Sequence, residues 1–447
     1  MKFWESFMFD SYCLVMSFNE RLAISRLLHR VGFGPKPGQF QAFYAKGFTR
    51  SASEVLALTP PTYGDVKLQL GITDLGPQPR PNTEAVVPYA DAKRNQLRAM
   101  SLWWLDQMVL QDFPLHERMT WFWHGHWATS YTKVDEPLVM FDHIERLRKH
   151  SLGNFTTMCE ELVTDAALMM WLDGQLNTAK SPNENFAREL LELFTLGVNR
   201  YSESDVKEVA RVLSGWKVEK HSGVVARNLR QSYLNPTTVL GTTALFDAVS
   251  LARFLSQQPS SQRFIAERLW FRFVSSSVAL PSGSGIESGF VGREILQAMK
   301  IMIMSKEFAD PAHAMVKSPL EWMVGVLRAL RITPSTYVQP DELLKSLTVM
   351  GQRHFFPPNV GGWASDEAWL SAASAQLRIQ TAQKLCNHGD LSPVTSVAQA
   401  SRLDALADWL GVAQWSQRTR DVLTGAITDP KRLVALSLVC PEYVVNS

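Results

Sequence analysis

The chain has 447 residues, which suffice for one large helical body or for two or three domains. Its 45 basic and 43 acidic residues leave a formal net charge of +2, so no broad surface for binding nucleic acid is expected. No apolar run reaches the roughly 18 residues that a membrane-spanning helix needs, so we predict a soluble protein without a transmembrane segment.

The first 18 residues are apolar but do not resemble an export signal. Glu5 and Asp10 interrupt the apolar run, and no small-residue cleavage site follows. Met16 is a second candidate start. We therefore predict that residues 1–18 are an N-terminal arm or an over-extended start. The missing signal favours a cytoplasmic location.

Apolar residues recur at helical spacing along most of the remaining chain. The predicted helices cover residues 19–31, 91–110, 141–151, 155–171, 181–197, 246–274, 291–308, 342–350, 374–386 and 401–445. A proline-rich connection covers 71–88, and the polar stretch 217–241 is predicted to form at most one small hairpin. We predict a mainly α fold, a multi-helical globular body with long irregular loops. Residues 19–447 form a single large domain, or alternatively subdomains 19–216 and 242–447.

The helix predicted over 181–197 concentrates charged side chains on one face. Ser181 suits the N-cap, Pro182 the first helical position and Glu184 a capping box, while Gly197 suits the end. The arc opposite its apolar stripe holds Glu184, Asn185, Arg188, Glu189 and Glu192. This face is either a solvated surface or the wall of a polar cleft, in which Arg188 is buried against a carboxylate.

Two histidines, His124 and His126, flank Gly125 in the aromatic run WFWHGHW. On an extended backbone both rings would share one face and could chelate a divalent metal, with Glu184, Glu189 or Asp173 as a third ligand. On a helix the two rings point about 200° apart, and only one faces the core. The apolar stripe upstream favours the helix, and both alternatives stay open.

The block FFPPNVGGW combines rigid prolines, permissive glycines and aromatic rings. Such a loop can present Phe356, Trp363 or the nearby Trp369 as a stacking surface for a sugar or peptide. The alternative is a rigid lid whose rings fill the core, because aromatic side chains bury large areas.

Several blocks together resemble the bacterial family catalogued as domain of unknown function 1800, in that family's order. The blocks are RLLHRVGFGP (26–35), MTWFWHGHW (119–127), WLDG (171–174), KSPNENFARELLELFTLGVNRYSESDVKEVARVLSGW (180–216), TVLG (238–241), KSPLEW (317–322), GQRHFFPPNVGGW (351–363) and CPEYVV (440–445). The resemblance implies a mostly helical bacterial protein with no established activity. It also implies export in many relatives and a sulfatase-like protein as a neighbour, so export remains an alternative to the cytoplasm.

One departure from the family pattern precedes TVLG. Relatives usually have a His-Asp pair and a lysine there, whereas this chain has Ser232, Tyr233 and Thr237. Any chemistry that this loop supports in relatives is expected to be altered or lost here.

Two functions from different classes follow. The first is an enzyme that acts on an envelope polymer or an ester, with candidate catalytic residues His124, His126, Glu184, Arg188 and Glu189. Asn185, Asp173, Phe356, Trp363 and Trp369 are its candidate ligand contacts, and a divalent metal on His124, His126 and Glu189 is one option for an otherwise unknown cofactor. The second is a non-catalytic helical partner of another protein, such as the sulfatase-like neighbour. The enzyme hypothesis predicts that His124 or His126 shares a pocket with Glu184, Arg188 or Glu189.

Overall fold

A computed structural model describes residues 19–446, and the prediction for residues 1–18 falls outside this range. The described chain is mainly α-helical, which confirms the predicted fold class. Within residues 19–446, no helix combines the length and the apolar character that crossing a membrane requires.

The helices follow one another with short connections and with several π and 3-10 turns. The first group is α1 (Glu20–Arg26), η1 (Leu27–Val31), α2 (Gln39–Lys46), α3 (Phe48–Leu56), α4 (Val66–Leu70), α5 (Val86–Leu110), α6 (Leu115–His126), α7 (Tyr131–Val134) and α8 (Pro137–Lys149). The second is α9 (Phe155–Leu162), α10 (Ala166–Trp171), η2 (Gly174–Leu176), α11 (Asn185–Glu189), η3 (Leu190–Thr195), α12 (Glu203–Val212), η4 (Leu229–Gln231), α13 (Ala248–Ser256), α14 (Pro259–Phe273), α15 (Gly285–Gly289) and α16 (Ile295–Ile303). The third is η5 (Lys306–Ala309), α17 (Pro319–Ala329), η6 (Pro334–Thr336), α18 (Pro340–Val349), η7 (Asp366–Trp369), α19 (Ala372–Cys386), α20 (Ser392–Thr395), η8 (Gln399–Ser401), α21 (Arg402–Leu410), α22 (Gln417–Thr424), α23 (Pro430–Ser437) and α24 (Pro441–Val444).

Helix starts follow local chemistry at most of these points. Ser318 and Glu321 form a capping box at the start of α17. The predicted helix over 155–171 is two helices, because the Asp165 side chain accepts a hydrogen bond from the Leu168 N–H and begins α10. The predicted helix over 246–274 also divides, since Pro259 begins α14.

The helix predicted to begin at Ser181 begins later. α11 starts at Asn185, and Ser181 is not its N-cap. Asn177 controls the preceding segment: its Nδ2 donates to the Ala210 carbonyl (2.7 Å), and its Oδ1 accepts from the Asn183 N–H (3.0 Å). These two bonds hold residues 178–184 in a turn, so a strong local capping pattern is overridden by a contact with α12.

The strand content exceeds the single hairpin that was predicted. β1 (Trp216–Val218) pairs with β2 (Val225–Arg227), and β3 (Thr237–Val239) pairs with β4 (Thr242–Ala244). Gly223 and Gly241 provide positive φ angles of 70° and 77° at the two turns. A third antiparallel pair joins β5 (Met315–Val316) to β6 (Val445–Asn446), with Val316 opposite Val445.

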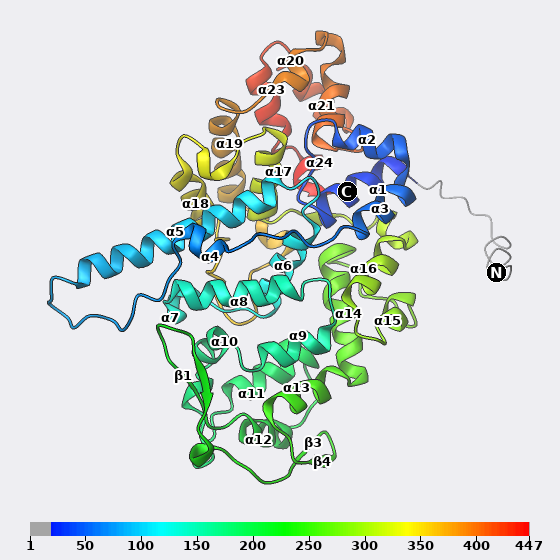
Figure 1. Ribbon diagram of the computed structural model, residues 1–447. Helices are drawn as coiled ribbons and strands as arrows, with labels where there is room; N and C mark the ends of the chain where they lie inside the picture. Colours follow the sequence, from blue (N-terminus) through cyan, green and yellow to red (C-terminus); the bar gives the residue numbers. More distant parts are fainter. Residues whose placement is uncertain (1–18, 447) are drawn as a thin grey trace.

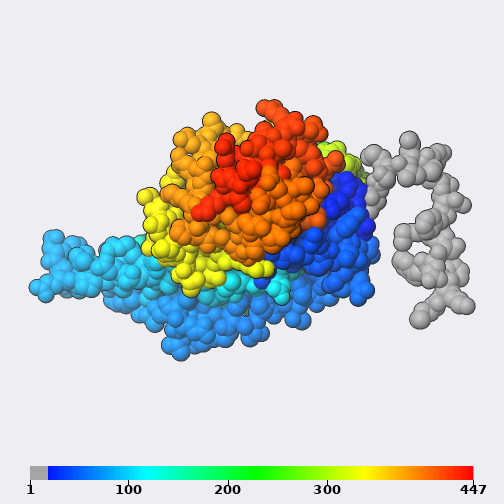
Figure 2. Space-filling model, turned by 90° about the horizontal axis from the view of Figure 1, so that it is seen from above, coloured from blue at the N-terminus to red at the C-terminus, as the bar shows by residue number. Residues whose placement is uncertain are grey.

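The hydrophobic core extends from Ala23 to Val444 and includes both ends of the described chain. Figure 1 shows the hairpins and α11–α13 at one end of the molecule and α20–α23 at the other. Figure 2 shows the C-terminal residues, orange to red, lying against the blue N-terminal segment, while the start of α5 and the loop before it project as an arm. The division into subdomains at residues 216 and 242 stays a prediction.

Candidate functional site

The polar face of α11 and η3 lies at the surface. Arg188 forms ion pairs with Glu203 (2.7 Å) and Glu184 (3.4 Å), and its side chain is 35% exposed. The prediction that Arg188 bonds to a carboxylate is therefore correct, but the prediction that it is buried is wrong. Burial, followed by the charge of Glu192, raises the pKa of the neighbouring Glu189.

His124 and His126 occupy a continuous helix, since α6 runs through Gly125 to His126. The Nε2 of His124 accepts from the Phe355 N–H (3.2 Å), whereas the Nε2 of His126 donates to the Phe194 carbonyl (3.0 Å). Within residues 19–446, no three His, Cys, Asp or Glu side chains are placed to hold a metal ion. The predicted metal arrangement of His124, His126 and Glu189 is therefore not formed.

The histidine helix and the glutamate segment do meet, but through their apolar sides. His126 reaches the main chain of Phe194 in η3, and only 2% of its surface is exposed. Burial lowers the pKa of His126 to about 3, so its ring is neutral. The prediction that His124 or His126 shares a pocket with Glu184, Arg188 or Glu189 is therefore wrong. The two segments pack through their apolar sides, and their polar side chains face other directions.

Four of the five predicted ligand contacts have structural partners within the fold. Asn185 donates to the Leu172 carbonyl (3.1 Å), Asp173 pairs with Lys133 (2.8 Å), Phe356 lies under the Arg353 guanidinium (4.5 Å) and Trp369 donates to the Ala364 carbonyl (3.0 Å). The fifth, Trp363, is half-buried on the wall of a cavity described next.

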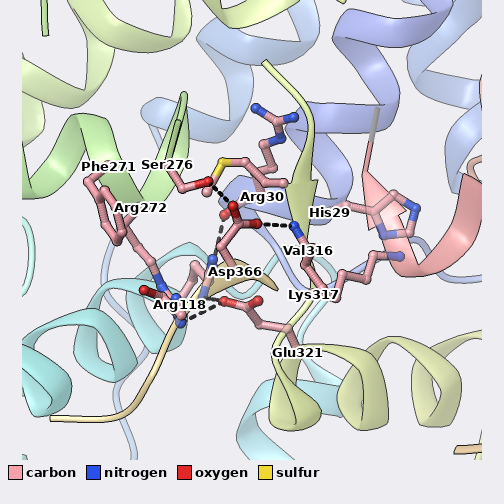
Figure 3. Close-up of a pocket in the computed structure, with 12 residues that line it drawn as sticks. His29, Arg30, Arg118, Phe271, Arg272, Ser276, Val316, Lys317, Glu321 and Asp366 are labelled. Atoms are coloured by element: carbon pink, nitrogen blue, oxygen red, sulfur yellow. Dashed lines mark hydrogen bonds and ion pairs between the residues drawn. The ribbon is translucent and has the colours of Figure 1, made fainter. Parts of the chain in front are cut away.

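Two adjoining cavities in the middle of the molecule form the candidate site. Cavity 1 (Figure 3) has a volume of about 20 Å³ and is lined by His29, Arg30, Arg118, Phe271, Arg272, Ser276, Met315, Val316, Lys317, Glu321, Ser365 and Asp366. Cavity 2 has a volume of about 80 Å³ and is lined by Trp121, Phe122, Gly125, Arg268, Phe271, Arg272, Gln352, Gly361, Trp363, Ala364 and Ser365. Because they share Phe271, Arg272 and Ser365, we call them together the arginine cleft.

A single carboxylate connects two of the arginines. Glu321 Oε2 accepts from the Ser318 N–H (2.9 Å) at the start of α17, and Oε1 lies 2.5 Å from Arg118 Nη1 and 3.0 Å from Arg272 Nη2. Burial alone would raise the pKa of Glu321, but the attraction of both guanidinium groups outweighs burial and lowers it to about 2. Glu321 is therefore ionised, and its oxygens are occupied.

The other carboxylate, Asp366, is also occupied by protein groups (Figure 3). It accepts hydrogen bonds from the Ser276 hydroxyl (2.6 Å) and from the Val316 N–H (2.8 Å). Its φ angle of +54° is unusual for a residue other than glycine. The charge of Asp366 also attracts Arg30, whose pKa burial lowers well below its usual value.

The cationic side chains outnumber these two carboxylates. Arg30, Arg118, Arg268, Arg272 and Lys317 all line the cleft. Arg268 forms no ion pair or hydrogen bond with another described residue, and its Nε is buried. Burial, followed by repulsion from Arg272, lowers the pKa of Arg268.

Lys317 lies on the far side of cavity 1, where its side chain runs toward His29 (Figure 3). Its buried Nζ has no hydrogen-bond partner among the described residues and lies 3.6 Å from the centre of the Tyr443 ring. Burial lowers the pKa of Lys317 well below its usual value. Even with a neutral Lys317, four guanidinium groups face two carboxylates.

The family-like blocks of the sequence indicate this site, whereas the chemistry of single residues does not. Four of the family-like blocks meet at the cleft, through Arg30, Trp121, Lys317 with Glu321, and Gln352 with Trp363. The block around Arg188 does not reach it. Arg268 and Arg272 lie one helical turn apart on α14, and nothing in their spacing distinguishes them from an ordinary solvated face.

The loop that departs from the family pattern lies outside the cleft. The Ser232 hydroxyl donates to the Asn228 carbonyl (2.9 Å), and the Tyr233 N–H donates to the Ser214 hydroxyl (2.8 Å). Thr237 is buried in β3. These residues support the hairpins, and an effect of the departure on activity stays a prediction.

The fold and cleft define a mainly helical protein with a basic internal cleft. The chain matches, over residues 26–445, the model of a family described as protein of unknown function (DUF1800), and it belongs to that family. Searches of curated proteins and of solved structures give no significant match.

Proposed function

We propose that the protein binds a ligand with an acidic group in the arginine cleft. The observation that carries this proposal is the composition of cavity 2, which is lined by Arg268 and Arg272 and by no carboxylate. Arg272 is paired with Glu321, but Arg268 has no counter-charge among the described residues, and an unpaired charge in a partly desolvated cavity is costly. A carboxylate, sulfate or phosphate group supplies that charge and matches the planar donor geometry of guanidinium.

The size of the cleft supports a small acidic group over a folded partner. With volumes of about 20 and 80 Å³, the two cavities have room for a small acidic group and a few water molecules, but not for a segment of a folded protein. This favours an acidic unit of an envelope polymer, or an ester, over a protein such as a sulfatase-like neighbour. Glu321 and Asp366 already interact with protein donors. The geometry therefore supports ligand binding as the main proposal, and catalysis on the bound ligand is a secondary proposal.

Anion binding can be measured directly by calorimetry and thermal unfolding. Sodium sulfate, phosphate and acetate are each compared with chloride at constant ionic strength, because exposed charges are screened by salt. We expect at least one anion to stabilise the protein, and we expect R268Q or R272Q to weaken binding at least about tenfold. R188Q, on the surface and outside the cleft, is the matched control and should bind like the parent. Equal losses in R188Q and R268Q, or no stabilisation beyond chloride, would contradict the proposal.

A further inference from the structure

Cavity 2 has aromatic walls in addition to its two guanidinium groups. Trp363 stacks on Trp121 with ring centroids 4.5 Å apart and an interplanar angle of 28°. Trp121 is 2% exposed, so it holds the Trp363 ring in place from the core side. Phe271 lines both cavities and is 36% exposed, which is unusual for a large apolar ring beside two arginines.

The remaining polar groups of cavity 2 are mostly unused donors. Gln352 Oε1 accepts from the Leu320 N–H (2.9 Å), so only its Nε2 donor remains, and it has no partner among the described residues. The buried indole N–H of Trp363 also lacks a described partner. Arg268 adds further donors without an acceptor. A complementary ligand therefore has an apolar face, several hydrogen-bond acceptors and a negative charge.

We propose that the ligand is an acidic saccharide, a sugar ring that carries a carboxylate or a sulfate ester. This inference rests on the proposed function and names its ligand class. A pyranose ring has an apolar C–H face for Trp363 and Phe271, and its hydroxyl oxygens accept hydrogen bonds from Gln352. The acidic group lies at Arg268 and Arg272. An inorganic anion would not pack against the rings of Trp363 and Phe271. An aromatic acid would leave the Gln352 amide donor without an acceptor.

Titration with defined sugars tests the ligand class. The probes are mono-, di- and tetragalacturonate, a sulfated disaccharide, neutral maltotetraose and inorganic sulfate, each followed by calorimetry. We expect an acidic saccharide to bind at least about tenfold more tightly than sulfate, and maltotetraose to show no binding. Tighter binding of either the carboxylated or the sulfated sugar supports the proposal and identifies the acidic group.

Variants of the aromatic walls distinguish this inference from the proposed function. F271A removes an exposed ring, and W363F keeps a smaller ring where a deletion would disturb the core. Each should lower the saccharide affinity at least about threefold and leave the sulfate affinity unchanged, while L229A, at an exposed apolar site in η4, changes neither. Sulfate binding that depends on Arg268, with no gain for any saccharide and no effect of F271A, overturns the acidic saccharide and leaves the proposed function standing. If the parent protein binds neither sulfate nor any acidic saccharide, both the proposed function and the acidic saccharide are overturned.

Discussion

Gly362 rests directly on the backbone of Gly125. A Cβ atom on Gly362 would lie 2.4 Å from the Gly125 carbonyl oxygen, and Gly362 has a φ angle of +84°. Helix α6 and the loop over 351–369 thus approach each other glycine to glycine, and this contact places Trp363 on the wall of cavity 2. Gly125 serves close packing and does not break the helix.

G362A should therefore disturb both stability and the cleft. The added methyl group clashes with main-chain atoms, and positive φ is unfavourable for alanine, so we expect a loss of about 2 kcal/mol or more in the free energy of unfolding. The affinity for an acidic saccharide should fall as Trp363 moves. G361A is the matched control: its φ is not in the left-handed region, and its Cβ would meet only the Asn359 side chain at 3.2 Å. Similar denaturation midpoints for the two variants would show that the glycine contact is not required.

E321Q should change stability and ligand affinity in opposite directions. The substitution keeps the shape of the side chain but leaves Arg118 and Arg272 without their shared counter-charge, at a cost of about 3 kcal/mol. The same change makes the cleft more positive, so sulfate should bind more tightly to the folded protein. Urea unfolding and calorimetry on one preparation measure both effects. A parallel fall in stability and affinity would mean that Glu321 shapes the site rather than neutralising it.

His354 should contribute to unfolding in acid. The ring is fully buried, neither nitrogen has a described partner, and burial followed by the Arg353 charge lowers the pKa to about 3. The unfolded chain binds a proton near pH 6.5 while the folded chain does not, so stability is complete above 6.5 and declines as the pH falls toward 3. The loss from this residue is about 2 kcal/mol at pH 5.

H354F should therefore shift the acid unfolding midpoint to lower pH, as followed by circular dichroism. H388F, at an exposed position, is the control and should leave the midpoint unchanged. A shift of the same size in both variants would exclude His354 as the source.

Arg328 should be among the residues most important for stability. Its guanidinium is 1% exposed and donates to five backbone carbonyls, those of Gly34, Met108, Val109, Gln111 and Asp112, at 2.7–3.1 Å. R328A would leave these acceptors unpaired around the C-terminal end of α5, so we expect a loss of at least about 3 kcal/mol in unfolding free energy. R331Q, which alters a mostly exposed ion pair with Asp390, should cost less than about 1 kcal/mol. Guanidinium unfolding of the pair provides the comparison.

Local chemistry explains which structural predictions succeeded. Capping boxes form at Ser202 and at Ser318, because the partners Asp205 and Glu321 lie only three residues away. The pattern at Ser181 fails because Asn177 binds a distant helix, and no local rule includes that contact. Helical periodicity predicted the fold class for the same reason, since it is a property of neighbouring residues.

The site depended on contacts that residue spacing does not record. His124 and His126 attracted attention as metal ligands, yet each bonds to a main-chain group far along the chain. Arg118 and Arg272 become a pair only through Glu321, which spacing identifies merely as a helix cap. The grouping of family-like blocks was the better indication, because blocks that are distant in sequence converge on one cleft.

The last strand, β6, supports one wall of the cleft and is synthesised long after the opposite wall. The Lys317 N–H bonds to the Val444 carbonyl (2.9 Å), and β6 holds the segment that forms one wall of cavity 1. Arg30, on the opposite wall, donates to the carbonyls of Val274 and His313. A ribosome that adds about 5–20 residues per second needs roughly 20 to 80 seconds between Arg30 and Val445. During that interval β5 lacks its partner strand, so a chain released before Val445 lacks the contact that holds this wall of cavity 1.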